Sequence, residues 1–201
     1  MHAITDAATL ALADFGVRAA AIAGAGSAVA LHARNRTATA AELVVAAAQL
    51  VALAAPAEAS VFVNGRPDLA AAIGAQGVQL AADDLVPADA KLVLRDGWVG
   101  RSVHSVTEAE AAVSEGADYL MAGTVYPTAS HPGRSGGGTA LVRELATLGV
   151  PVIAIGGITA ARAAELRDAG AWGVAAISAL WHAADPAAAA LDLLGPWLEM
   201  A

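Results

Sequence analysis

Two arginines lie two residues apart at the end of one predicted strand. Arg34 and Arg36 directly follow a short apolar run. Because successive side chains of a strand point to opposite faces, both guanidinium groups can point to the same side. Paired guanidinium groups bind carboxylate or phosphate through charge-assisted hydrogen bonds. The spacing favours a contact with an anionic ligand, and an ion pair with a surface Asp or Glu is the alternative.

Two later apolar runs pass into helix-forming segments through small or uncharged residues. The first run ends in Gly156 and Gly157, and the second ends in Ile177 and Ser178. Backbone amides at the start of a helix bind phosphate, and glycine lets the backbone approach a ligand closely. We therefore expect these four residues to form a phosphate site. The alternative is that the two glycines only permit a tight turn between strand and helix.

Three histidines lie at predicted strand ends, where a group that titrates near neutral pH could transfer a proton. They are His32, His104 and His131. His131 is the favoured candidate because it lies beside a glycine-rich segment, residues 133–138, that we expect to be mobile. We expect the whole loop 128–138 to close over the ligand. His104 is the second candidate for the catalytic base.

Other polar residues are also expected at strand ends, as candidates for contacts with a substrate. They are Asn64, Ser102, Thr124, Thr128 and Ser130. The adjacent Asp83 and Asp84 could bind Mg²⁺, but such a pair at a loop is more often a solvated turn or a helix cap. We therefore expect no metal site unless a substrate phosphate completes it.

The elements that position these residues alternate between short apolar runs and Ala-rich helical segments. Eight strands are predicted, over residues 2–5, 28–33, 60–64, 77–80, 98–103, 119–123, 152–155 and 173–177. Helices are predicted over residues 40–54, 107–115, 160–169 and 186–194. This alternation favours an α/β fold with one (β/α)8 TIM barrel spanning residues 1–201, whose chemistry collects at the carboxyl ends of the strands.

A doubly wound sheet is the alternative fold. Gly24 and Gly26 begin like a dinucleotide-binding fingerprint, but Val29 stands where the third glycine belongs. The acidic residue that would contact a ribose is also missing. The barrel is therefore preferred.

Composition narrows the class of function. The chain has 201 residues, 57% of them hydrophobic, and a net charge of −8, so attraction to nucleic acid or to an anionic membrane has no electrostatic basis. The apolar content is largely Ala, and we expect neither a membrane span nor a secretory signal. With no Cys, a cytoplasmic location is expected. The Ala-rich helices offer flat faces that could form a homo-oligomer.

Catalysis by an imine-forming lysine is not expected. All the basic residues except Lys91 are Arg. Lys91 lies in the polar segment 87–95, which we interpret as a loop or a helix end. A Schiff base needs a lysine amine inside the site, so we do not expect this chemistry.

Several ordered sequence blocks resemble the thiamine-phosphate synthase and TenI superfamily over nearly the whole chain. These blocks are residues 2–6, 63–70, 77–80, 100–105, 116–119, 123–128 and 153–158. The resemblance implies a TIM barrel that binds a small-molecule thiazole phosphate, with the phosphate against Gly157 and the turn at Ile177 and Ser178. It thus agrees with the phosphate site inferred from the glycines.

Within this superfamily the chain resembles the TenI-type thiazole tautomerases most. That resemblance implies an isomerase of thiamin biosynthesis that aromatises a thiazole carboxylate phosphate by proton transfer, with no cofactor. The alternative is a thiamine-phosphate synthase, a transferase that joins thiazole phosphate to hydroxymethylpyrimidine pyrophosphate with Mg²⁺. Synthases carry Gln, Asp and Lys where this chain has His32, Gly65 and His131. Asp84 would then be the remaining Mg²⁺ ligand, and the tautomerase is the preferred hypothesis.

One departure concerns the tautomerase hypothesis itself. Some TenI-type enzymes carry a proton-transferring His at the position of Thr124. A Thr hydroxyl is not a base near neutral pH, so we assign proton transfer to His131, with His104 second, and carboxylate binding to Arg34. A third hypothesis is a non-catalytic, regulatory protein that binds the ligand without turning it over.

Overall fold

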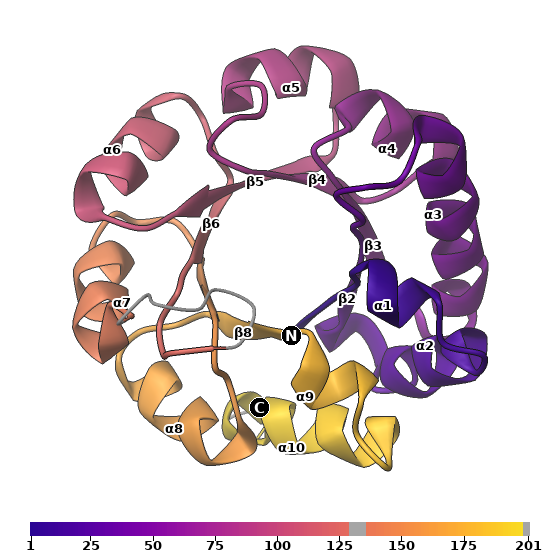
Figure 1. Ribbon diagram of the computed structural model, residues 1–201. Helices are drawn as coiled ribbons and strands as arrows, with labels where there is room; N and C mark the ends of the chain where they lie inside the picture. The colour runs from indigo at the N-terminus through magenta and orange to yellow at the C-terminus, as the bar shows by residue number, and fades with distance from the viewer. Residues whose placement is uncertain (129–135, 199–201) are drawn as a thin grey trace.

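Eight parallel strands form a closed barrel in sequence order, from β1 to β8 (Figure 1). The computed structural model describes residues 1–128 and 136–198. The strands are β1 (His2–Ile4), β2 (Ala30–Ala33), β3 (Ser60–Asn64), β4 (Gly77–Leu80), β5 (Trp98–Val103), β6 (Tyr119–Ala122), β7 (Val152–Ile155) and β8 (Gly173–Ala176). The (β/α)8 barrel predicted from the sequence is confirmed.

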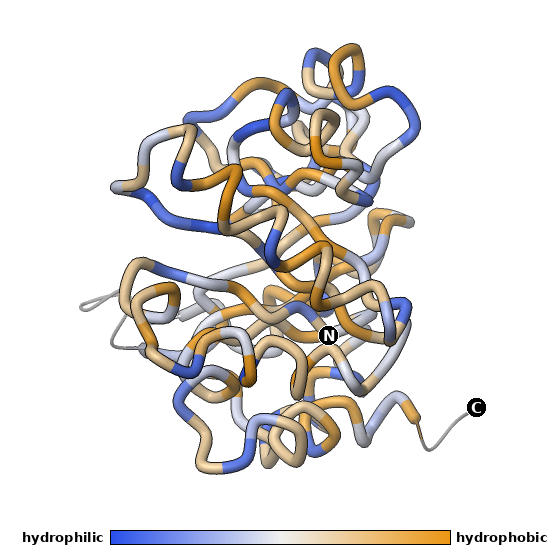
Figure 2. The backbone as a smooth tube through the Cα atoms, turned by 90° about the vertical axis from the view of Figure 1, so that its right-hand side faces the viewer, coloured by the Kyte–Doolittle hydropathy of each residue, from blue (hydrophilic) through white to orange (hydrophobic). Residues whose placement is uncertain are grey.

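Helices surround the barrel on its outside (Figure 1). They are α1 (Ala7–Leu10), α2 (Phe15–Ala23), η1 (Gly26–Ala28), α3 (Ala40–Ala54), η2 (Ala55–Ala57), α4 (Pro67–Ile73), α5 (Pro87–Leu94), α6 (Val106–Ser114), α7 (Gly138–Ala146), α8 (Ala160–Asp168), α9 (Ser178–Trp181) and α10 (Pro186–Leu198). Many strongly hydrophilic segments lie at the edge of the molecule, and hydrophobic segments run through its interior (Figure 2).

Helix α3 shows how the sequence sets an element. The Thr39 hydroxyl accepts from the Glu42 amide, and the Glu42 carboxylate accepts from the Thr39 amide at 2.8 Å, which forms a capping box. Its buried side chains recur at helical spacing and face the barrel; they are Leu43, Ala47, Leu50 and Ala54.

Within the described residues, Ala40–Ala57 is the one segment long and apolar enough, by length and composition, to cross a membrane.

The inside of the barrel is unusually polar. Most such barrels fill this space with Val, Ile and Leu. Here His32 and Gln79 are buried inside the strands, beside the aromatic rings of Phe62 and Tyr119. The partly buried His2 ring lies in the same cluster, 5.0 Å from the His32 ring. The lower half of the barrel therefore contains hydrogen-bonding groups beneath the strand ends.

Strands β1 and β8 close the barrel over a short pairing. Two residue pairs join them, His2 with Ala175 and Ala3 with Ala176. Across this junction, an Arg18 guanidinium nitrogen on α2 donates to the Ala183 carbonyl at 2.8 Å, beyond α9. The first and last parts of the chain thus meet at one seam.

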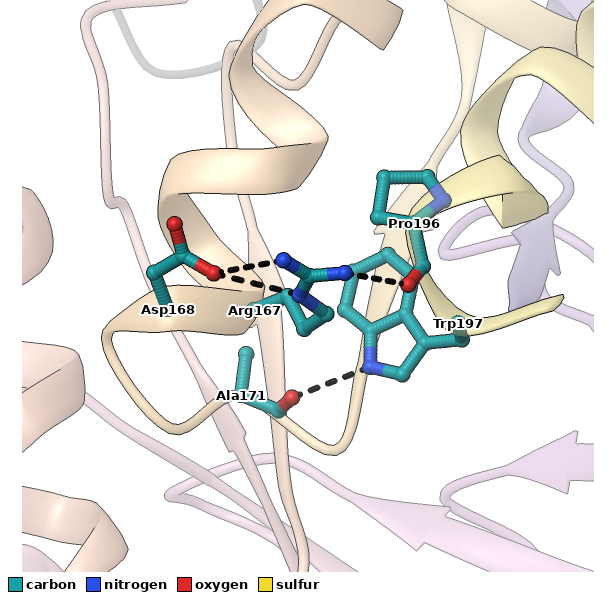
Figure 3. Close-up of polar contacts among 5 residues, drawn as sticks. All are labelled: Arg167, Asp168, Ala171, Pro196 and Trp197. Atoms are coloured by element: carbon teal, nitrogen blue, oxygen red, sulfur yellow. Dashed lines mark hydrogen bonds and ion pairs between the residues drawn. The ribbon is translucent and has the colours of Figure 1, made fainter. Parts of the chain in front are cut away.

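The end of α10 is fixed to the corner between α8 and β8 (Figure 3). The Trp197 indole nitrogen donates to the Ala171 carbonyl at 3.1 Å, and Arg167 donates to the Pro196 carbonyl at 2.7 Å. The same guanidinium also contacts Asp168. These contacts hold the last helix against the barrel.

The structure places two segments that the sequence left open. Gly24 caps the end of α2 and Gly26 begins η1, both before β2, whereas a dinucleotide fingerprint follows a strand and opens a helix. The doubly wound alternative is therefore not supported. Lys91 lies in the last turn of α5, so the helix-end interpretation is confirmed, and its ammonium pairs with Asp118 at 2.5 Å. The α5 helix begins with Pro87 in its first turn, which suits a helix start.

Candidate functional site

A cavity of about 730 Å³ opens at the carboxyl ends of the strands. It brings together every predicted site residue in the described part of the chain except His32. These are Arg34, Arg36, Asn64, Ser102, His104, Thr124, Thr128, Gly156, Gly157, Ile177 and Ser178. Ser130, His131 and residues 133–135 of the glycine-rich segment lie outside the described residues. The roles assigned to His131 as the base and to the loop 128–138 as a lid therefore stay predictions.

One wall of the cavity carries positive charge. Arg34 and Arg36 both line it, directly after β2. Thr5 anchors the backbone here, because its hydroxyl contacts the Arg34 carbonyl at 2.9 Å and accepts from the Arg34 amide at 2.9 Å. Burial, followed by the neighbouring Arg36 charge, lowers the pKa of Arg34, although an arginine keeps its charge near neutral pH.

Neither of these guanidinium groups forms an ion pair within the described residues, where the pairs formed involve Arg18, Arg66, Lys91 and Arg167. The surface ion-pair alternative for Arg34 and Arg36 therefore has no support from this geometry. The Asp6 carboxylate interacts with Arg34 only beyond ion-pair distance. Two such cations in a cavity suit an anionic ligand.

A second wall, after β7 and β8, is formed by backbone. Gly156 and Gly157 have positive φ angles of 103° and 63°. A Cβ atom at Gly156 would lie 2.7 Å from the Thr124 methyl group, and one at Gly157 would lie 2.7 Å from the Pro127 carbonyl oxygen. Glycine is thus required by chain geometry as well as by any ligand. The tight turn and the phosphate site are compatible, since the same glycines leave backbone exposed to the cavity.

Two helices begin beside this backbone wall. Helix α8 starts at Ala160 after Gly157, and the short helix α9 starts at Ser178. The first amides of a helix have no partner within it, and the helix dipole favours negative charge there. An Arg162 guanidinium nitrogen donates to the Gly157 carbonyl at 2.6 Å, which fixes the turn from behind. This wall can hold an anion without a charged side chain on it.

His104 lines the cavity, with its Nδ1 atom against the Gly123 carbonyl oxygen. Because a carbonyl oxygen only accepts, Nδ1 carries the proton and Nε2 keeps its lone pair in the neutral ring. His104 can therefore accept a proton or a hydrogen bond at Nε2.

His32 lies elsewhere than expected. It is buried inside the barrel beneath the cavity and does not line it. Its Nε2 atom is 2.8 Å from Nδ1 of His2, and its Nδ1 atom is 3.1 Å from the Asn64 side-chain oxygen. Burial lowers the pKa of His32 to about 4, so the ring is neutral near pH 7. His32 lies one residue before the end of β2, as in the predicted strand 28–33, but its side chain points into the barrel and does not reach the cavity.

Sequence reasoning missed the hydrogen bonds beneath the cavity. Besides the contact between His32 and Asn64, the Gln79 amide donates to the Ser102 hydroxyl at 3.0 Å. The signal was present in the alternation of the strands, since His32 shares a face with Arg34 and so must point inward. Which strands' inward residues touch one another depends on barrel register, which the sequence does not state.

The carboxylates at this end fit a Mg²⁺ ion that arrives with a substrate phosphate. Asp83 and Asp84 line the cavity after β4, and an Asp84 oxygen accepts from the Ala81 amide at 2.7 Å. A Cβ at Gly65 would lie 3.2 Å from both Asp84 carboxylate oxygens, so Gly65 leaves one side of this carboxylate open. The described residues contain no group of three or more potential metal ligands. Mg²⁺ is commonly held by one or two carboxylates together with substrate phosphates.

Comparisons with known proteins point to one family. A model of the family described as thiamine monophosphate synthase, TMP-TENI, matches residues 1–180. Thiamine-phosphate synthase of Mycolicibacterium gilvum is 45% identical over 139 residues, which are 68% of this chain and 59% of that protein. The protein of the same name from Methanoculleus marisnigri is 39% identical over 86% of this chain and 83% of its own length.

A solved structure gives the same result. Thiamine phosphate pyrophosphorylase from Pyrococcus furiosus superposes with a TM-score of 0.83 and 32% identity, covering 98% of this chain and 95% of that one.

The preference for a thiazole tautomerase, an isomerase, is overturned by these comparisons. Relatives at 42% to 46% identity are named as thiamine-phosphate synthases, so the transferase alternative is the better supported one. The tautomerase hypothesis was based on positions where this chain lacks the residues of a synthase. The absence of a few side chains is weaker evidence about the reaction than similarity over a whole barrel.

Proposed function

The chain belongs to the thiamine monophosphate synthase family, and from this premise we propose that it joins a thiazole phosphate to hydroxymethylpyrimidine pyrophosphate, forming thiamine phosphate. Members of this family bind small-molecule phosphate substrates. The observation that carries the proposal for this chain is the contrast between the two walls of its cavity. One wall offers unpaired guanidinium groups, and the other offers helix-start backbone.

The proposed reaction forms one bond and breaks one bond. The thiazole ring nitrogen attacks the methylene carbon of the pyrimidine, and the carbon–oxygen bond to pyrophosphate breaks. The electron pair leaves with pyrophosphate, and the ring nitrogen becomes positively charged. No proton is removed in this step, so a general base is not required. Thr124 at the position of the tautomerase histidine is therefore compatible with this reaction.

In this proposal the two substrates use different walls. The thiazole phosphate lies against Gly157 and Ser178, where backbone amides and helix dipoles favour an anion. The pyrophosphate lies near Arg34 and Arg36, whose charges stabilise the departing anion. This arrangement turns the two reacting carbon and nitrogen atoms toward each other between the walls.

A Mg²⁺ ion would be held by Asp84, with Asp83 beside it, and by the pyrophosphate itself. When bound, it supplies positive charge that neutralises the leaving group. In this chain Gly65 contributes no carboxylate, so a larger share of that neutralisation falls to Arg34 and Arg36.

The test supplies both substrates and Mg²⁺ to the purified protein and follows thiamine phosphate by chromatography and pyrophosphate by ³¹P NMR. We expect both products at equal rates, and neither product when one substrate is omitted. A rate no higher than in a protein-free control, at saturating concentrations of both substrates, would overturn the proposal. Binding of thiazole phosphate without turnover would then favour the non-catalytic alternative.

A further inference from the structure

A chain of side-chain hydrogen bonds runs through the barrel from its amino-terminal mouth to the floor of the cavity. His2 on β1, His32 on β2 and Asn64 on β3 form it, with contacts of 2.8 Å between the imidazoles and 3.1 Å from His32 to Asn64. Phe62 stacks on the His32 ring at 5.1 Å with an interplanar angle of 10°. The His32 ring is therefore held in one orientation by contacts on its face and at both nitrogens.

The hydrogens in this chain have one consistent direction. The Asn64 oxygen Oδ1 only accepts, so the proton between it and His32 belongs to His32 Nδ1. A neutral imidazole carries one proton, so His32 Nε2 must accept, and His2 Nδ1 must donate to it. Burial lowers the pKa of both rings, which keeps them neutral near pH 7.

We propose that His32, supported by His2, is a positioning residue that fixes the Asn64 amide with its NH₂ group toward the cavity. This inference rests on the proposed function, because it assigns that NH₂ group to an anionic oxygen of the pyrophosphate. Asn64 lines the cavity on β3, between Arg34 after β2 and Asp84 after β4. An Asn amide that is free to rotate can also present its oxygen to the anion, and that orientation repels it.

The strongest prediction comes from comparing isosteric and apolar variants. Asn64→Asp keeps the oxygen that accepts from His32 but removes the NH₂ group, and we expect KM for the pyrimidine pyrophosphate to rise about tenfold. His32→Leu leaves the Asn64 amide unfixed, and we expect a rise of about fivefold. His32→Gln restores a group that both donates and accepts, so KM should return to within about twofold of the wild-type value.

A purely structural role for His32 predicts a different pattern. The control is Ile153→Val, which disturbs the same inner cluster of side chains from β7 and changes none of the three hydrogen-bonded residues. If Ile153→Val raises this KM as much as His32→Leu, the positioning role is wrong. The double variant His32→Leu with Asn64→Asp should be no worse than Asn64→Asp alone, because both changes act on one contact. Additive losses would also overturn the inference.

Two further measurements separate this inference from the proposed function. Calorimetry with inorganic pyrophosphate needs no turnover, so weaker binding by His32→Leu would support the positioning role even if no thiamine phosphate forms. Normal turnover by wild type with an unchanged KM in His32→Leu would sink the positioning role alone. ¹⁵N NMR of the protein without ligand should show the His32 proton on Nδ1, and a proton on Nε2 would overturn the inference whatever the variants do.

Discussion

The cavity has one wall of charged and polar side chains, on β2 to β4, and one wall of backbone, after β7 and β8. Arg34 and Arg36 carry the charge of the first wall. The second has Gly156 and Gly157, whose missing side chains make room for the β6 loop as well as for a ligand. The side-chain wall depends on residues that can be exchanged singly. The backbone wall depends on chain geometry, so a change there affects folding and binding together.

The interior beneath the walls differs in the same way. Under β1 to β3 lie His2 and His32, both neutral because burial lowers their pKa. Under β7 and β8 lie the apolar side chains of Ile153 and Ala175. Acid can therefore protonate the buried imidazoles under β1 to β3, whereas the side chains of Ile153 and Ala175 under β7 and β8 do not titrate. The following experiments use this asymmetry.

The largest effect is expected from acid. The folded pKa of His32 is about 4 and its ordinary value is 6.5, so the unfolded chain binds its proton first as pH falls. Stability is complete above pH 6.5 and decreases toward pH 4, by up to roughly 3 kcal/mol from His32. Denaturant unfolding from pH 7 to pH 4 measures this loss. Hydrogen exchange should show β2 and β3 losing protection before β7 and β8, and uniform loss would contradict the asymmetry.

His32→Leu provides the control for the acid effect. The variant should lose most of the pH dependence between 6.5 and 4, with the remainder due to His2. A variant with the same pH dependence as wild type would show that other groups, such as the carboxylates, are responsible.

The next effect is expected from Arg34→Ala. Removing a guanidinium from the side-chain wall should lower kcat/KM by roughly 50-fold, about 2.3 kcal/mol, because charge-assisted hydrogen bonds to the leaving anion are lost. Steady-state kinetics with the pyrimidine pyrophosphate varied measure it. Arg143→Ala is the matched control, since that arginine lies on α7 and contacts Thr139. Equal losses in both variants would indicate a general charge effect.

A smaller effect on activity is expected from Gly157→Ala in the backbone wall. The φ angle of 63° and the close Pro127 carbonyl oxygen make this substitution strained, so stability should fall by about 1 to 3 kcal/mol. KM for the thiazole phosphate should rise roughly tenfold while KM for the pyrophosphate substrate stays constant. Gly149→Ala is the control, because its φ of 79° is equally unfavourable but no atom lies within 4 Å. A rise in both KM values would argue against the binding of the two substrates to different walls.

The smallest effect is expected from Gly65→Asp, which adds a carboxylate beside Asp84 on the side-chain wall. The Mg²⁺ concentration that gives half-maximal activity should fall by roughly threefold, since Mg²⁺ gains a ligand. Gly65→Asn tolerates the same positive φ of 72° without the charge and serves as the control. An equal effect of Asn and Asp would show that charge is not the cause.

The sequence predicted the barrel better than the site. Strand bounds such as Ser60–Asn64 and Val152–Ile155 were predicted correctly, because apolar runs ended by turn residues depend on local chemistry. The residues around the cavity were also found, since strand ends converge in any such barrel. The inward direction of His32 follows from the alternation along β2, but its link to Asn64 depends on the register between strands, which the sequence does not state. The reaction was misjudged because single residues were weighed above similarity along the chain.

The seam between β1 and β8 also bears on how the protein folds. The strands it joins stand near opposite ends of the sequence, and their pairing is short. Closing such a long loop costs entropy that nearby contacts do not, so we expect this junction to form late. Arg34 lies on one side of the seam and Ser178 on the other. A nascent or truncated chain can then have most of its strands in place and still lack a binding site, and ligand binding would report the final closure of the barrel.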